Sequence, residues 1–122
     1  MIAAFLLSAL VAAAPAHLQI QPWNGKDLPT ASRSAVKYRL VVSGKPNAHV
    51  RLEATAVADG WIAAFCTSEV CAPGHVAIDL PQSGQAVYQF ELIREDDAAP
   101  RKSGARIVGD DGSSIDVPIA KR

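Results

Sequence analysis

The chain of 122 residues carries 12 basic and 12 acidic side chains, two cysteines and a single methionine. This length fits one domain and excludes a catalytic domain joined to a separate binding domain. The balanced charge argues against a nucleic-acid binder, which needs a clear excess of Lys and Arg on one face. The composition is that of a globular protein, so disorder over most of the chain is not expected.

The first segment, residues 2–14, reads IAAFLLSALVAAA and is apolar apart from Ser8. As a helix it spans about 20 Å, short of the roughly 30 Å hydrocarbon core of a bilayer. A short apolar core followed by small residues is typical of a secretory signal peptide. Because Ala14 and Ala16 fill the small-residue positions, we expect a signal peptide over residues 1–16 and a secreted or periplasmic domain over residues 17–122. The lack of a basic residue before the core leaves an uncleaved anchor as the alternative.

The mature chain shows repeated period-two alternation of apolar and polar residues and no long stretch at helical spacing. Such alternation predicts strands with one face in a core and the other in water. Glu53 and Glu91 fall on the solvent-facing positions. The expected strands lie within residues 36–42, 50–56, 61–65, 76–80, 88–92, 107–108 and 115–119. The expected core contains Tyr38, Leu40, Leu52, Trp61, Ile78, Phe90, Leu92 and Val117.

Turn signals separate these strands. Gly112 follows two aspartates, which is typical of a tight hairpin because Gly tolerates φ > 0. The longest polar loops cover residues 95–104 and 23–34. Short strands at this spacing predict a single antiparallel β-sandwich of seven to eight strands.

The strand layout resembles the immunoglobulin-like and fibronectin-type-III-like sandwiches of bacterial envelope and secreted proteins. The resemblance covers essentially all of residues 17–122 and implies an immunoglobulin-like β-sandwich. True immunoglobulin domains have a disulfide between residues distant in sequence, whereas Cys66 and Cys71 are separated by only four residues. The resemblance therefore gives no support for antibody-like recognition.

The most distinctive segment is Cys66-Thr67-Ser68-Glu69-Val70-Cys71. Its spacing differs from the two-residue gap of thioredoxin-type motifs and from the repeated pairs of zinc sites. In an oxidising compartment a local disulfide is the expected state of these cysteines. Closing so short a loop stabilises the fold by roughly 2 kcal/mol in the chain-entropy description.

Metal binding is the alternative interpretation of the cysteines. Cys66, Cys71 and His75 give Cys-x4-Cys-x3-His, which is similar to the copper loop of the cytochrome-oxidase subunit II domain. That similarity implies a copper ion on these side chains. The first gap is one residue longer than in that family, and Ile78 stands where the family has a methionine.

A second copper hypothesis starts at the expected N-terminus of the mature chain. After cleavage, His17 offers an α-amine and an imidazole to one ion. His49 or His75 would complete a copper site, because nitrogen ligands suit this metal. This periplasmic copper-binding protein is the alternative to the function expected below.

The sequence holds no nucleophile–base motif, cofactor fingerprint or P-loop, so we expect no catalytic residue and no cofactor. The expected function is a non-catalytic exported module that contacts a protein, a glycan or a surface. A loop closed by a disulfide loses less ordering entropy on binding. We therefore expect the contact surface between Thr67 and His75, with Glu69 and Val70 as further binding residues.

Export makes a direct prediction about mass. Protein recovered from the envelope or the medium should begin at His17, because signal peptidase cuts after Ala14-Pro15-Ala16. Intact-mass spectrometry measures this difference. A full-length mass, with the protein retained inside the cell, contradicts the prediction.

Overall fold

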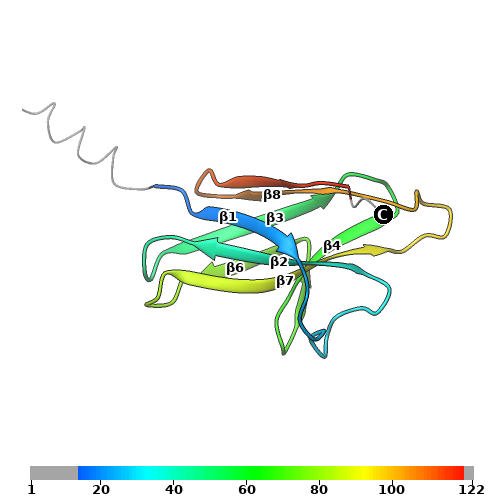
Figure 1. Cartoon of the computed structure of the whole chain (residues 1–122). Helices are drawn as coiled ribbons and strands as arrows, with labels where there is room; N and C mark the ends of the chain where they lie inside the picture. Colours follow the sequence, from blue (N-terminus) through cyan, green and yellow to red (C-terminus); the bar gives the residue numbers. More distant parts are fainter. Residues whose placement is uncertain (1–13, 120–122) are drawn as a thin grey trace, which may run out of the picture.

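The computed structural model describes residues 14–119, and within this range the chain forms nine strands in two antiparallel sheets (Figure 1). Sheet A has the order β1-β2-β7-β4-β5 and contains β1 (His17–Pro22), β2 (Val36–Ser43), β7 (Gln85–Arg94), β4 (Trp61–Cys66) and β5 (Cys71–Pro73). Sheet B has the order β6-β3-β8-β9 and contains β6 (His75–Asp79), β3 (His49–Ala56), β8 (Ala105–Gly109) and β9 (Ser114–Val117). The expected all-β antiparallel sandwich is confirmed, but the predicted number of seven to eight strands is wrong: the described residues form nine, and β1 and β5 were not among the expected strands.

The expected signal peptide falls mostly on residues 1–13, which lie outside the described residues. Strand β1 begins at His17, the residue at which we expect the mature domain to start. Among residues 14–119 there is no helix with the length and apolar character needed to cross a membrane.

The β2–β7 ladder forms the centre of sheet A. It runs in register from Val36 opposite Leu92 to Ser43 opposite Gln85. Strand β7 also pairs with β4 on its other side, so it is hydrogen-bonded along both edges. Every second side chain of β7 therefore faces the space between the sheets, and the side chains in between face outward from sheet A.

The core lies between the two sheets and is built around Phe90 of β7. Its ring centroid lies 5.3 Å from that of Phe65 and 6.4 Å from that of Tyr38, and the rings are tilted as aromatic pairs prefer. Seven of the expected core residues are buried, and Tyr38 is half-buried against them. The buried seven are Leu40, Leu52, Trp61, Ile78, Phe90, Leu92 and Val117.

Gly74 joins the two sheets where the chain passes from β5 to β6. Its φ of 78° lies in the left-handed region, which residues with a Cβ rarely adopt. Its N–H donates to the carbonyl of Ala63 at 2.9 Å, and its carbonyl accepts from the N–H of Ala54 at 2.8 Å. One residue thus bonds to β4 in sheet A and to β3 in sheet B.

The β8–β9 hairpin has the expected tight turn, with Gly112 at a φ of 91°. Asp111 also anchors the start of the described chain, because its Oδ2 accepts from the N–H of Ala16 at 2.8 Å. Burial alone would raise the pKa of Asp111. Hydrogen bonds from Ser113 and from the backbone N–H of Ala16 outweigh burial, so the pKa is lowered.

Replacing Phe90 by Ala should lower the free energy of unfolding by about 2–5 kcal/mol, because the cavity opens in the centre of a small core. Urea denaturation followed by far-UV circular dichroism measures the loss. Val87→Ala in the same strand is the matched control, since Val87 is 45% exposed, and it should shift stability by about 0.5 kcal/mol or less. Equal effects of the two changes contradict this core, as does a spectrum dominated by helix.

Candidate functional site

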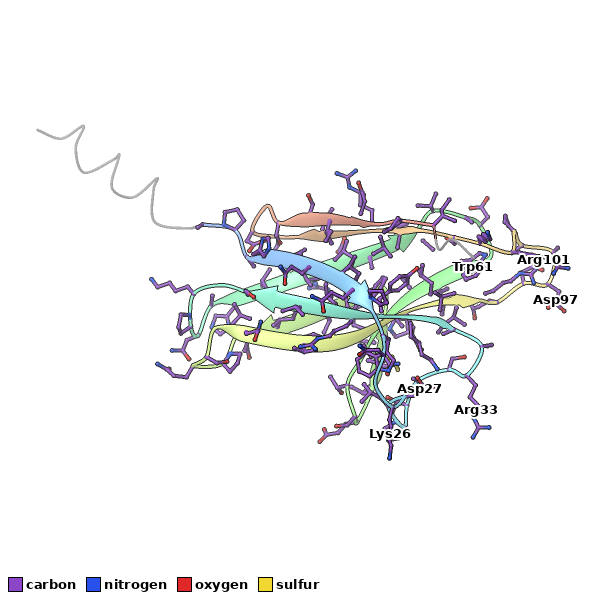
Figure 2. All side chains as sticks on the ribbon, in the orientation of Figure 1. Lys26, Asp27, Arg33, Trp61, Asp97 and Arg101 are labelled. Carbon is purple, nitrogen blue, oxygen red and sulfur yellow. A yellow bond between two sulfur atoms is a disulfide. The ribbon has the colours of Figure 1, made fainter. Side chains whose placement is uncertain are left out.

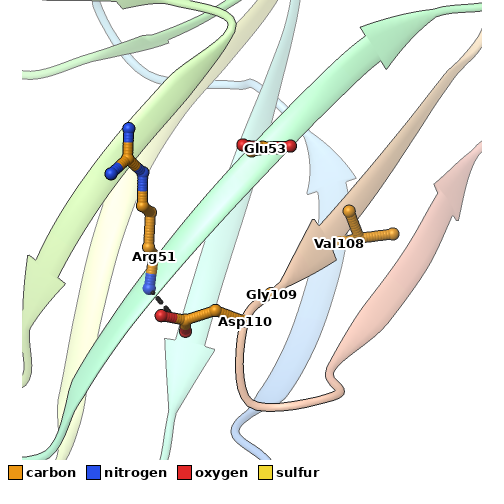
Figure 3. Close-up of a pocket in the computed structure, with 5 residues that line it drawn as sticks. All are labelled: Arg51, Glu53, Val108, Gly109 and Asp110. Carbon is orange, nitrogen blue, oxygen red and sulfur yellow. Dashed lines mark hydrogen bonds between the residues drawn. The ribbon is translucent and has the colours of Figure 1, made fainter.

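A shallow depression lies on the outer face of sheet B (Figure 3). It has a volume of about 220 Å³ and is lined by Arg51, Glu53, Val108, Gly109 and Asp110. The backbone N–H of Arg51 donates to Asp110 Oδ1 at 3.0 Å, while the guanidinium extends away from that carboxylate. The charged side chains here are exposed and the hollow is open to solvent. It lacks the buried polar groups that define a catalytic cleft.

A more unusual arrangement covers the outer face of sheet A. Gln89 and Glu91 point outward from β7, yet each is only 1% exposed. The connection between β1 and β2, residues 23–35, lies across them, and we call it the covering loop. The N–H of Leu28 donates to Gln89 Oε1 at 3.1 Å. The N–H of Ser32 donates to the Glu91 carboxylate at 3.2 and 3.3 Å.

The expectation that Glu91 faces solvent is therefore wrong, whereas Glu53 does face solvent. Alternation along β7 predicted correctly which face of sheet A carries Glu91. It could not predict that a loop more than fifty residues earlier covers that face. Ala64 and Cys66 of β4 are buried on the same face, outside the core between the sheets.

The expected disulfide between Cys66 and Cys71 is present in the structure. The two cysteines are directly opposite each other in the β4–β5 pair and close a hairpin, residues 66–71, which we call the clipped hairpin. Inside it, the N–H of Thr67 donates to the carbonyl of Val70 at 2.8 Å. The Thr67 hydroxyl accepts from the N–H groups of Glu69 and Val70, both at 3.3 Å. The tip is therefore held by its own backbone bonds as well as by the disulfide.

The covering loop and the clipped hairpin are attached to each other. The hydroxyl of Thr30 donates to the carbonyl of Thr67 at 2.8 Å, and the carbonyl oxygen of Thr30 lies 3.2 Å from Cys71 Sγ. The same sulfur lies 4.0 Å from Glu91 Oε1. Both segments project on one side of the sandwich, where Lys26 and Arg33 are labelled (Figure 2).

Burial is the largest influence on the pKa of the Glu91 carboxyl. Burial raises the pKa of its carboxyl above the ordinary value, and this outweighs the hydrogen bond from Ser32 and the attraction of Lys37, which lower it. Lys37 is only partly available as a counter-ion, because its Nζ lies 2.5 Å from Asp27 Oδ2 in the covering loop. The carboxyl therefore holds its proton to a higher pH than an exposed glutamic acid does.

Three buried donors have no hydrogen-bond partner among the described residues. They are Trp23 Nε1 in the covering loop, Tyr38 Oη, whose ring packs in the core, and Gln89 Nε2 of the outer face of sheet A. Gln89 lies directly opposite Cys66 in the β4–β7 pair. An unpaired buried donor is costly, so such groups mark positions where a further polar partner is favourable.

Most of the predicted binding residues lie together at the hairpin tip. Glu69 and Val70 are exposed, Val70 by 58%, and Thr67 is half-buried at the base. His75 lies apart from them, beyond Gly74, in β6 opposite Glu53. The segment that we treat as one loop in the sequence is thus a hairpin of sheet A followed by an edge strand of sheet B.

The histidines of the copper hypotheses lie on three different strands. His17 begins β1 in sheet A, whereas His49 and His75 lie in sheet B. His49 Nδ1 contacts Asp79, and His75 lies opposite Glu53, four residues further along β3, roughly 13 Å away. Within residues 14–119 the only group with metal-ligand spacing is Cys66, Cys71 and Glu91. Because the two sulfurs are bonded to each other, this group offers no thiolate to a metal.

Comparisons of the chain with protein-family models, with curated proteins and with solved structures found no match.

The raised pKa of Glu91 predicts a pH dependence of stability. A carboxyl that binds its proton more tightly in the folded state contributes stability at low pH, and this contribution is lost as pH rises through the folded-state pKa. Glu91→Gln should remove that contribution, which changes by at most about 1.4 kcal/mol per pH unit. Urea denaturation of both proteins from about pH 4 to about pH 8 measures the difference.

Glu95→Gln is the matched control, because Glu95 is an exposed carboxylate just after the same strand. Its stability profile should follow that of the unchanged protein. If the profiles of Glu91→Gln and the unchanged protein run parallel across this pH range, Glu91 does not titrate with a raised pKa.

Proposed function

We propose that the chain is an exported, non-catalytic β-sandwich module that binds a protein partner through the tip of the clipped hairpin and the adjoining part of the covering loop. The observation that carries this proposal is Val70. It is a large apolar side chain, 58% exposed, at the tip of a hairpin that is closed by a disulfide and tied at its base to Thr30.

The rigidity of this tip supports a role in binding. A flexible loop must lose conformational entropy when it binds, at about 0.5–1.5 kcal/mol for each immobilised side chain. In the clipped hairpin much of that ordering is already present, because Thr67 bonds to the backbone of Glu69 and Val70. A surface built in this way binds with less loss of entropy than a free loop of the same composition.

The chemistry of the surface favours a protein over a glycan. Among the described residues the large exposed apolar side chains are all aliphatic, whereas sugar rings are bound mainly on exposed aromatic faces. Charged residues of both signs lie in the two segments, with Glu69 next to Val70 in the hairpin and Lys26, Asp27 and Arg33 in the covering loop (Figure 2). An apolar centre with a mixed polar rim is the usual anatomy of a protein interface.

The finer fold assignment is part of this proposal: the sandwich is immunoglobulin-like. In such domains the sheets have the strand orders A-B-E-D and C-F-G. The orders β1-β2-β7-β4 and β3-β8-β9 match these two patterns if the strands are lettered accordingly. Strands β5 and β6, which pair with the outer edges of β4 and β3, have no counterpart in the seven-strand form. Export by the signal peptide would place this module in the periplasm or outside the cell.

A photo-crosslinking residue at position 70 tests the proposed surface in intact cells. Irradiation should give a discrete adduct with one protein, because the tip is buried in the complex. The matched control carries the same residue at Val57, which is 70% exposed in the connection between β3 and β4. An absence of adduct at position 70, or the same adducts at both positions, contradicts the proposal.

The purified partner then allows a binding measurement. Val70→Asp should weaken the complex about tenfold or more, since it places a charge in the apolar centre of the interface. Glu69→Ala should weaken it less, because rim charges contribute little to affinity. Val57→Asp should leave the affinity unchanged. Equal affinity of the Val70→Asp variant and the unchanged protein rules out this surface.

A further inference from the structure

The two sulfurs of the disulfide differ in their access to solvent. Cys66 is completely buried on the outer face of sheet A, whereas Cys71 is half-buried at the edge of the same sheet. Cys71 is the more exposed of the two cysteines, so Cys71 Sγ is the expected point of attack for a thiolate from solution. Attack on Cys71 Sγ would make Cys66 Sγ the leaving group, and Cys66 is buried.

The surroundings of the disulfide contain acceptors that a disulfide cannot use. The carbonyl oxygen of Thr30 lies 3.2 Å from Cys71 Sγ, and Glu91 Oε1 lies 4.0 Å from it. A sulfur in a disulfide carries no hydrogen, so neither oxygen receives a hydrogen bond from it. A thiol at this position of Cys71 would have both acceptors beside it.

The Glu91 carboxyl lies close to both sulfurs of the disulfide. One carboxylate oxygen of Glu91 and the two sulfurs all lie within 4.8 Å of one another. The carboxyl is 1% exposed, so bulk water does not compete for this position. We propose that Cys66 and Cys71 form a thiol–disulfide exchange site in which Glu91 donates a proton to the departing Cys66 thiolate.

The exchange is balanced with a small-molecule or protein thiol as the reductant. Its thiolate sulfur bonds to Cys71 Sγ, the Cys66–Cys71 bond breaks, and the electron pair leaves on Cys66 Sγ, which takes the proton of Glu91. A second thiolate attacks the reductant's sulfur in the mixed disulfide and releases Cys71, which takes a proton from water. Glu91 regains its proton from solvent. The protein gains two electrons and two protons, and two thiols become one disulfide.

A second polar side chain lies on the same face of sheet A as the leaving sulfur. Gln89 lies directly opposite Cys66 in the β4–β7 pair, where side chains on one face are about 5 Å apart. Its Nε2 has no hydrogen-bond partner among the described residues. In the disulfide form this donor makes no hydrogen bond to Cys66 Sγ. An N–H group that turned toward the departing thiolate would stabilise its charge until the proton arrives.

The other charged groups near Glu91 leave its proton available. Lys37 on β2 favours the ionised carboxylate, and Asp27 in the covering loop opposes it. These two are paired with each other, so their effects partly cancel. Burial raises the pKa of the Glu91 carboxyl, which extends the pH range over which it can donate a proton.

The exchange does not require a partner at Val70, and it goes beyond the function proposed above.

The test is the rate of disulfide reduction by dithiothreitol in the full exported chain, followed by alkylation and mass spectrometry. The rates are measured from about pH 5 to about pH 9, a range that spans a raised carboxyl pKa and a thiol pKa. At each pH the rate is divided by the concentration of the dithiothreitol thiolate, so that ionisation of the reductant does not contribute to the profile. The rate for the unchanged protein should fall about tenfold or more as Glu91 loses its proton. Glu91→Gln should give a slow rate that does not vary with pH.

Glu95→Gln is the control, because it removes an exposed carboxylate after the same strand and should keep the normal profile. Circular dichroism of each variant at the assay temperature ensures that reduction occurs in the folded protein. A flat profile for the unchanged protein overturns the proposal without reference to any variant. Equal rates for the folded Glu91→Gln variant and the unchanged protein at low pH overturn it as well.

Discussion

Two buried polar side chains of β7, Gln89 and Glu91, hold the covering loop on the outer face of sheet A, and the candidate site depends on this attachment. They accept hydrogen bonds from the N–H groups of Leu28 and Ser32, which would otherwise lie at a buried interface without partners. A purely apolar contact could let the loop slide over the sheet, whereas these bonds fix its register. The sandwich thereby gains a partial third layer on one side, next to the central strand of sheet A.

The positions of the remaining parts follow from this attachment. Once the loop is fixed, Thr30 reaches the base of the clipped hairpin and bonds to Thr67. The hairpin is then held at the disulfide, at Thr67 and through β5 at the sheet edge, so that Val70 is presented on a rigid tip. The proposed binding surface is thus connected to Glu91 through a short series of direct contacts. This path links a buried titratable group to an exposed apolar side chain.

Much of the fold could be predicted from the sequence because period-two alternation reports which residues of a strand share a face. It located the Phe90 core, and the turn at Gly112 and the disulfide were predicted from local composition. The burial of Glu91 could not be predicted in this way, since alternation does not reveal what covers a face. One signal was available: β4 is apolar without interruption from Trp61 to Cys66, which is typical of a strand that is buried on both faces. The separation of His75 from the hairpin depends on the left-handed backbone at Gly74, where the chain changes sheets.

Two opposing effects act on the protonation of the Glu91 carboxyl. The bond from Ser32 is stronger to an ionised Glu91, while burial favours the protonated form, and Lys37 is already paired with Asp27. Under the proposed exchange, reduction of the disulfide removes the proton of Glu91 and transiently leaves a buried charge whose strongest donor is the backbone of the covering loop. Reduction would also release the covalent closure of the hairpin that carries Val70. The proposed exchange would therefore couple the redox state of the two cysteines to the rigidity of the proposed binding surface through Glu91.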